Sequence, residues 1–146
     1  PPLRKEADRK ALIKGIKEGL IDVIVSDHKP EDEESKRLPF AQAAEGSIGI
    51  ETLLSLALEL YHNESLSLKK IIETITCNPA KILKINKGTL KKGLDADLCI
   101  FDLNEPWKVD VSRLKSKSKN AAIENRKLQG KVLMTYLKGE SVFNFQ

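Results

Sequence analysis

An aspartate and a histidine follow a short apolar segment and precede a long polar one. Asp27 and His28 come directly after residues 20–25, which are mainly aliphatic and β-branched. If those residues form a strand of an α/β barrel, both side chains lie at its carboxyl end, where such barrels build their active sites. A carboxylate there could bind a metal ion or transfer a proton. An aspartate that simply opens a loop has the same position, and a lone histidine is more often a hydrogen-bonding surface residue.

Glycines around residue 46 are a second candidate contact for a ligand. Gly46 and Gly49 precede a strongly apolar segment, and glycine lets backbone N–H groups come close to a bound molecule. Glycines ahead of a helix are more often ordinary caps. Between Asp27 and these glycines, residues 28–45 show no periodicity, and polar loops of this length are typically functional or disordered.

The elements that must position these residues are helices and one strand. Residues 5–18 place apolar side chains at helical spacing, and Gly19 follows as a stop signal. Residues 20–25 predict a strand that is buried on both faces. Such a strand needs neighbours on both sides, so we expect the chain to be incomplete at its N-terminal end.

More helices are predicted downstream, followed by strands. The helices are residues 47–60, residues 68–75 with Ser67 as N-cap, and a short one with Asn78 as N-cap and Pro79 at its first position. From Gly88 the pattern changes to about four short strands, too few for an independent sheet. We place a domain boundary near Asn86, which separates residues 1–86 from 87–146.

The composition is that of a soluble globular domain. The chain has 146 residues, 40% apolar and 32% charged. A complete (β/α)₈ barrel takes roughly 250 residues, and no apolar run approaches the roughly 18 to 20 residues of a membrane span. The chain opens without a basic and then apolar leader, so we expect no signal peptide. Cys77 and Cys99 lack a CxxC spacing and are expected to be thiols in a reducing cytoplasm.

The net charge of +4 is distributed unevenly. Residues 1–62 carry 9 basic and 12 acidic side chains, whereas residues 63–146 carry 16 and 9. A basic half can bind nucleic acid, but lysines scattered over solvated faces give the same total. The one basic cluster, residues 113–119, has no aromatic side chain to stack on a base. A nucleic-acid-binding module at 113–138 is therefore the weakest functional hypothesis.

Six short motifs occur in a fixed order along the chain. They are Pro1-Pro2-Leu3-Arg4, the segment IDVIVSDHKP at 21–30, Gly46-x-x-Gly49-Ile50-Glu51-Thr52, Asn78-Pro79-Ala80-Lys81, Gly93-x-Asp95-Ala96-Asp97-Leu98 and Ser116-Lys117-Ser118-Lys119-Asn120. In this order they resemble the C-terminal part of the dihydroorotase family of the amidohydrolase superfamily. The fourth and fifth motifs are shared by many amidohydrolases, hydantoinases included, whereas the first and last point to the dihydroorotases.

The resemblance implies an α/β fold: the C-terminal part of an amidohydrolase (β/α)₈ TIM barrel plus the C-terminal strands of a small β domain. Residues 1–86 would hold the last helix–strand unit of the barrel and its trailing helices. Residues 87–146 would be the C-terminal part of the β-sandwich subdomain. This placement explains why both the buried strand and the later strands lack neighbours in the chain.

The resemblance also implies a zinc-dependent hydrolase with Asp27 as both metal ligand and catalytic residue. In the family this aspartate takes a proton during attack on the ring amide and returns it to the leaving nitrogen. The histidine ligands of the zinc would lie upstream of these residues. The chain alone is therefore expected to bind zinc poorly and to be inactive.

Two substrate-contacting positions depart from the family. Glu31 stands where relatives usually have a histidine that helps to bind the substrate carboxylate, with Lys29 and Lys36 as the nearest cations. Glu45-Gly46 replaces a Phe-Gly pair whose backbone contacts the substrate. A carboxylate facing a carboxylate is repulsive, so the first change is the more serious.

The implied function is the interconversion of N-carbamoyl-L-aspartate and L-dihydroorotate in pyrimidine synthesis. Its implied partners are the N-terminal part of the same protein and either a second copy or an aspartate transcarbamoylase, with no nucleic acid and no membrane. The alternatives are another cyclic amidohydrolase, or a non-catalytic relative that serves as a structural partner of aspartate transcarbamoylase. Glu31 favours the non-catalytic alternative, whereas the retained Asp27 opposes it.

Overall fold

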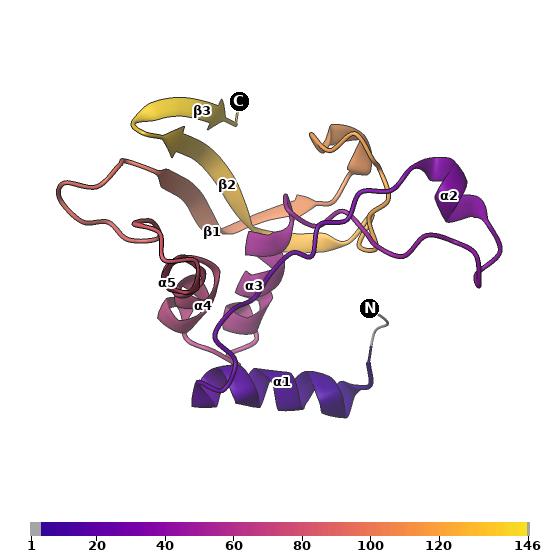
Figure 1. Cartoon of the computed structure of the whole chain (residues 1–146), viewed down its shortest axis with the longest axis horizontal. Coiled ribbons are helices and arrows are strands. Elements are labelled where there is room, and N and C mark those ends of the chain that lie inside the picture. Colours follow the sequence, from indigo (N-terminus) through magenta and orange to yellow (C-terminus); the bar gives the residue numbers. More distant parts are fainter. Residues whose placement is uncertain (1–3, 146) are drawn as a thin grey trace.

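The computed structural model describes residues 4–145, so most of the first motif, Pro1-Pro2-Leu3, and Gln146 lie outside the described residues. Helices occupy the first part of the chain and an antiparallel sheet the second (Figure 1). The elements are α1 (Glu6–Glu18), α2 (Glu33–Arg37), α3 (Leu53–His62), α4 (Leu68–Ile75), α5 (Cys77–Ile82), β1 (Leu98–Lys108), the 3₁₀ helix η1 (Val111–Arg113), β2 (Lys127–Leu137) and β3 (Glu140–Asn144). The predicted order of helices and then strands is confirmed. No helix in the described part of the chain is long and apolar enough to cross a membrane.

Helix α1 forms where its periodicity predicts, and a glycine ends it. Gly19 has φ +78°, and its N–H group donates to the carbonyls of Gly15 and Ile16. This left-handed conformation closes a helix, and glycine adopts it without a steric penalty. Ile16 is buried, whereas Ala7 and Ala11 are exposed, so the buried face of α1 is confined to its C-terminal half.

The core lies between α1, α3 and α4. Ile16, Ala57, Leu66 and Ile71 form one buried cluster. Each buried aliphatic side chain of this kind contributes about 1.5–3 kcal/mol to folding. Helix α4 begins as predicted, because the Ser67 hydroxyl accepts the N–H of Lys70 at 3.3 Å.

Residues 20–25 do not form the strand that the sequence predicts. Leu20 is 77% exposed and Val25 is 70% exposed, so the segment is not buried on both faces. Within residues 4–145 the one sheet contains β1, β2 and β3, and none of them lies beside this segment. An unpaired segment has no ladder of hydrogen bonds, and the apolar pattern remains without the neighbours that it requires.

Asn78 does not cap α5, contrary to the prediction. The helix begins at Cys77 with Thr76 at the N-cap position. The Asn78 side chain instead donates to the carbonyl of Asp22 at 2.9 Å. The Asn-Pro-Ala motif therefore fixes the segment that leads to Asp27.

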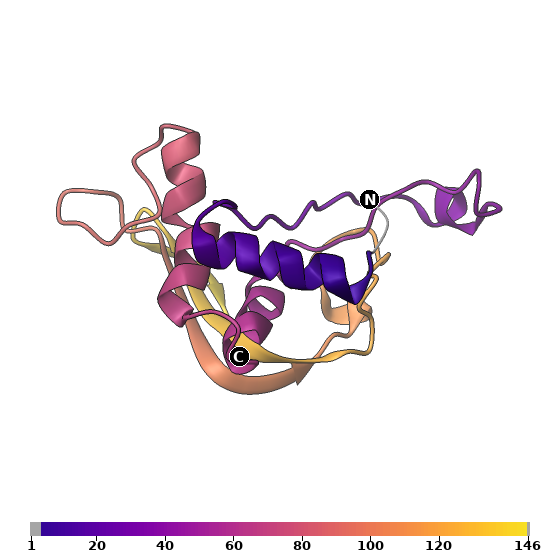
Figure 2. The same ribbon diagram turned by 90° about the horizontal axis from the view of Figure 1, so that it is seen from below.

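The sheet is antiparallel, in the order β1-β2-β3. The sheet has three strands, whereas about four short strands were predicted. Strands β1 and β2 are also longer than predicted, with 11 residues each. Helix α3 packs against β2, where the fully buried Leu58 meets Gly130. Figure 2 shows the loop that carries α2 extending to one side, beyond the core helices and the sheet.

Candidate active-site loop

Asp27 stands exposed at the start of the long loop, and the segment before it is held at two points. The N–H of Ile24 donates to the carbonyl of Thr74 at 3.1 Å, and Asn78 binds the carbonyl of Asp22. Asp27 itself has φ 45°, a conformation that few residues other than glycine adopt. Glu64, Lys84, Asn125 and Lys138 also have positive φ values, and aspartate is one of the residue types enriched in this region, so this conformation does not by itself mark Asp27 as functional.

His28 positions the loop. Its Nδ1 accepts the N–H groups of Gly49 at 3.1 Å and Ile50 at 3.3 Å. Gly49 is required there, because a Cβ on it would lie 2.9 Å from the carbonyl oxygen of Ser26. The N–H of Gly49 therefore binds a side chain of the loop, whereas its sequence context suggested a ligand contact. His28 is the hydrogen-bonded residue that its isolation in the sequence predicts.

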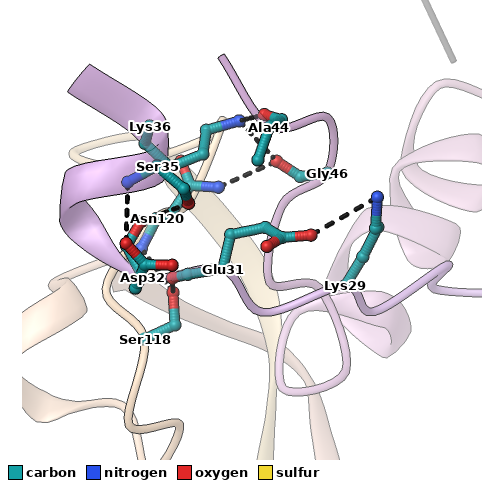
Figure 3. Close-up of polar contacts among 9 residues, drawn as sticks. All are labelled: Lys29, Glu31, Asp32, Ser35, Lys36, Ala44, Gly46, Ser118 and Asn120. Carbon is teal, nitrogen blue, oxygen red and sulfur yellow. Dashed lines mark hydrogen bonds and ion pairs between the residues drawn. The ribbon is translucent and has the colours of Figure 1, made fainter. Parts of the chain in front are cut away.

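Lys29 brings Glu31 and Gly46 together. Its Nζ lies 3.3 Å from Oε1 of Glu31, whose side chain is only 22% exposed. The Lys29 stem packs against Gly46, where a Cβ would lie 2.8 Å from it (Figure 3). Gly46 has φ +119°, so this position needs glycine for both space and conformation. Glu45, the residue before it, is exposed.

Lys36 cross-links the loop from the short helix α2. Its Nζ donates to the carbonyls of Ala44 at 2.6 Å and Gly46 at 3.1 Å. Helix α2 is itself capped by Asp32, whose carboxylate accepts the N–H of Ser35 at 2.7 Å. The hydrogen bonds from Ser35 lower the pKa of Asp32. Residues 28–45 are therefore an ordered loop with one helical turn, an organisation that aperiodicity did not predict.

Residues 114–122, here called the strap, lie across this loop. The Ser118 hydroxyl donates to the carbonyl of Glu31 at 2.7 Å, and the Asn120 amide donates to that of Gly46 at 2.8 Å (Figure 3). The loop and the strap enclose a groove of about 650 Å³. Sequence reasoning gave the strap no role in the site. The feature of the sequence that could have indicated such a role was the Ser-Lys-Ser-Lys-Asn motif at 116–120.

Asp27 fits a divalent metal as one carboxylate ligand. Within residues 4–145 no group of three or more histidine, cysteine, aspartate or glutamate side chains could hold a metal ion. A catalytic zinc site usually takes three protein ligands. The described residues alone therefore do not form such a site.

The family model of the amidohydrolase family matches residues 2–142, and the chain belongs to this family. Among curated relatives, it is 47% identical over 143 residues to a dihydroorotase of Ehrlichia canis, covering 98% of this chain and 32% of the relative. It is 46% identical to a dihydroorotase of Aquifex aeolicus, covering 98% of this chain and 34% of that protein. The chain thus spans about a third of the length of the curated relatives that it matches.

Solved structures agree with this assignment. The L-hydantoinase (dihydropyrimidinase) of Arthrobacter aurescens is similar with a TM-score of 0.91 and 34% identity, over 99% of this chain and 33% of the other. A D-hydantoinase (dihydropyrimidinase) of Thermus sp. has a TM-score of 0.89 and 25% identity, over 99% of this chain and 33% of the other. The resemblance to part of a longer amidohydrolase is confirmed.

Proposed function

We propose that this chain is the C-terminal third of a dihydroorotase, an enzyme that interconverts N-carbamoyl-L-aspartate and L-dihydroorotate. The observation that carries the proposal is the 47% identity over 98% of the chain to a protein of that name. Residues 1–86 would be the last helix–strand unit and the trailing helices of a (β/α)₈ barrel. Residues 87–146 would be the C-terminal part of the β-sandwich subdomain.

Asp27 is the proposed catalytic residue. In the hydrolytic direction, water attacks the carbonyl carbon of the ring amide, and the carboxylate of Asp27 takes up the proton that the water loses. The C–N bond then breaks, and the same proton passes to the leaving nitrogen. An exposed carboxylate at the end of a segment held by Thr74 and Asn78 suits this shuttle.

Zinc is the proposed metal, with Asp27 as the ligand that this chain supplies. When bound, zinc lowers the pKa of water and polarises a carbonyl. The remaining ligands are assigned to residues upstream of this chain.

Glu31, Glu45 and Gly46 are the proposed substrate-contacting residues, and Lys29 joins them. The ammonium of Lys29, 3.3 Å from the carboxylate of Glu31, offsets the charge that would repel an anionic substrate. Lys36 is bound to two carbonyls and holds the loop together. Lys29 is therefore the cation of the proposed substrate site.

The finer assignments of partner and compartment follow from the same proposal. The enzyme would act in the cytoplasm, which agrees with the free thiols of Cys77 and Cys99. It would assemble either with a second copy of itself or with an aspartate transcarbamoylase. Size-exclusion chromatography with and without that enzyme distinguishes the two assemblies.

Replacement of Asp27 tests the catalytic assignment. In the full-length protein, Asp27→Asn is expected to lower kcat for dihydroorotate hydrolysis by about 10²–10⁴-fold, the usual value of a positioned proton-transfer group. Zinc content is measured in parallel, and replacement of exposed Asp22, whose side chain has no such role, serves as the control. An Asp27→Asn enzyme with unchanged kcat would contradict the assignment.

A further inference from the structure

We infer that the strap is a positioning element for substrate binding, with Ser118 and Asn120 as its positioning residues. This inference rests on the function proposed above and assigns a part in it to residues far along the chain. Ser118 lies 87 positions after Glu31, and Asn120 lies 74 positions after Gly46. The strap thus joins the two ends of the loop that carries the proposed substrate contacts.

The first contact fixes the position of Glu31. The Ser118 hydroxyl donates to the Glu31 carbonyl at 2.7 Å, while the Glu31 side chain pairs with Lys29. The backbone of Glu31 is therefore held from the strap and its side chain from within the loop. Loss of the hydroxyl would free the backbone and with it the Lys29–Glu31 pair.

The second contact fixes Gly46 and the residues after it. The Asn120 amide donates to the Gly46 carbonyl at 2.8 Å, and its backbone carbonyl accepts the N–H of Ile48 at 2.9 Å. Ser47 adds a third connection, because its hydroxyl accepts the N–H of Ala122 at 3.0 Å. Asn120 thus binds the loop through both its side chain and its backbone.

The strap is itself anchored, so that it can act as a fixed support. The carboxylate of Glu51, just before α3, accepts the N–H groups of Lys115 at 2.9 Å and Ser116 at 3.0 Å. Where the strap joins the sheet, the N–H of Asn125 donates to the carbonyl of Val109 at 2.8 Å, and Val109 is fully buried. The anchors of the strap therefore lie just before α3 and just after β1, outside the loop that it holds.

Different contacts therefore hold different parts of the loop. The segment before Asp27 is held by Thr74 and Asn78, and neither of these two bonds involves the strap. The strap binds Glu31 and Gly46 directly and so helps to set their positions relative to Lys29. Weakening the strap should therefore raise KM while kcat changes little.

The test compares Ser118→Ala and Asn120→Ala with Ser116→Ala in the full-length protein. Ser116 is the matched control, because within the described residues its hydroxyl makes no hydrogen bond and its backbone contact to Glu51 is retained. Each test variant is expected to raise KM for dihydroorotate by about threefold to tenfold, the equivalent of one lost hydrogen bond. Ser118→Thr, which keeps the hydroxyl, is expected to restore the wild-type KM.

Hydrogen exchange gives a second readout that does not depend on activity. Faster exchange confined to residues 28–47 in both test variants is expected, with α1 and α4 unchanged. Exchange and KM equal to those of Ser116→Ala would overturn the inference, as would faster exchange throughout the chain. If the wild-type protein does not turn over dihydroorotate, the proposed function fails, whereas the exchange experiment still decides the role of the strap.

Discussion

Lys29 and Glu31 form an ion pair at the position that the family resemblance gives to binding of the substrate carboxylate. The replacement of a histidine by Glu31 looks unfavourable when the sequence is considered alone, because it places like charges together. In the structure the ammonium of Lys29 lies 3.3 Å from that carboxylate. The pair carries no net charge, and Lys29 still offers N–H donors to an anion.

We predict that Lys29→Met raises KM for dihydroorotate by about tenfold or more, because it leaves the Glu31 carboxylate uncompensated beside the substrate. Glu31→Gln in the Lys29→Met background should recover part of this loss by removing the repulsion. Lys29→Arg, which keeps the charge, is the control. Steady-state kinetics of the single and double variants measure the coupling, and a KM unaffected by Lys29→Met would exclude this lysine from the substrate site.

The resemblance singled out Asp27, Glu31 and Gly46, but not how they are held. Asp27 and Gly46 belong to recognisable motifs and Glu31 directly follows one, so their places in the chain could be predicted. The contacts of Lys36 and Asn120 with the Gly46 carbonyl could not be predicted from the sequence. Such contacts depend on how a loop folds back on itself and on which distant segment packs over it, and neither leaves a period in the sequence.

At the scale of elements, Gly130 is a point of close contact between α3 and the sheet. It has φ +91°, and a Cβ on it would lie 2.4 Å from Cδ1 of Leu58, a fully buried side chain. Its carbonyl also accepts the indole N–H of Trp107 at 3.2 Å. The contact between helix and sheet therefore depends on the absence of a side chain here.

Gly130→Ala is expected to lower the free energy of unfolding by about 2–5 kcal/mol, through backbone strain and overpacking together. Gly139→Ala separates the two effects, because Gly139 has φ +85° and open space around its Cα. That control should cost about 1–3 kcal/mol from strain alone. Urea unfolding of both variants provides the comparison, and equal losses would mean that the Leu58 contact is unimportant.

The turn before β1 depends on one lysine. Lys87 Nζ lies 2.7 Å from Asp95 and 2.5 Å from Asp97, two members of the Gly-x-Asp-Ala-Asp-Leu motif. The hydrogen bond from Lys87 lowers the pKa of Asp97, with a second contribution from the N–H of Lys138. The two aspartates in turn raise the pKa of Lys87.

The Lys87→Met variant is expected to be less stable than the wild type across neutral pH. Because the folded pKa of Asp97 is lowered, its contribution is complete above the unfolded value of about 3.9 and disappears as the pH falls through the folded value. The difference in urea midpoint should therefore be constant between about pH 5 and 9 and shrink in stronger acid. Lys92→Met, at an exposed position nearby, is the control, and a difference that grows in acid would contradict the assignment.

Element types were more predictable than their surroundings. Helices α1 and α4 follow from an apolar period that a sequence displays directly. Residues 47–60 were predicted as a helix because they are strongly apolar, whereas α3 begins at Leu53 and ends at His62. The segment 20–25 was predicted as a strand buried on both faces, and in the described chain it is neither paired with a strand nor buried on both faces. Its apolar residues suit a position between two neighbouring strands. The apolar pattern therefore indicates neighbours that the described chain does not contain.

At the scale of the molecule, several large apolar side chains are exposed. Those on the segment after α1 and around α5 are Leu20, Val25, Ile82, Leu83 and Ile85. Exposed apolar surface of this extent usually marks an interface. Coverage by the rest of a longer amidohydrolase accounts for it, in agreement with relatives about three times as long.

The central claim is that the full-length protein is a dihydroorotase and not another cyclic amidohydrolase or a non-catalytic relative. The most direct measurement compares kcat/KM of the zinc-loaded protein for L-dihydroorotate with that for 5,6-dihydrouracil, a related ring without the carboxylate. With Lys29 as the anion-binding group, we expect dihydroorotate to be preferred by about a hundredfold or more. Equal or better turnover of dihydrouracil would contradict the claim, and so would a zinc-loaded protein that converts neither ring.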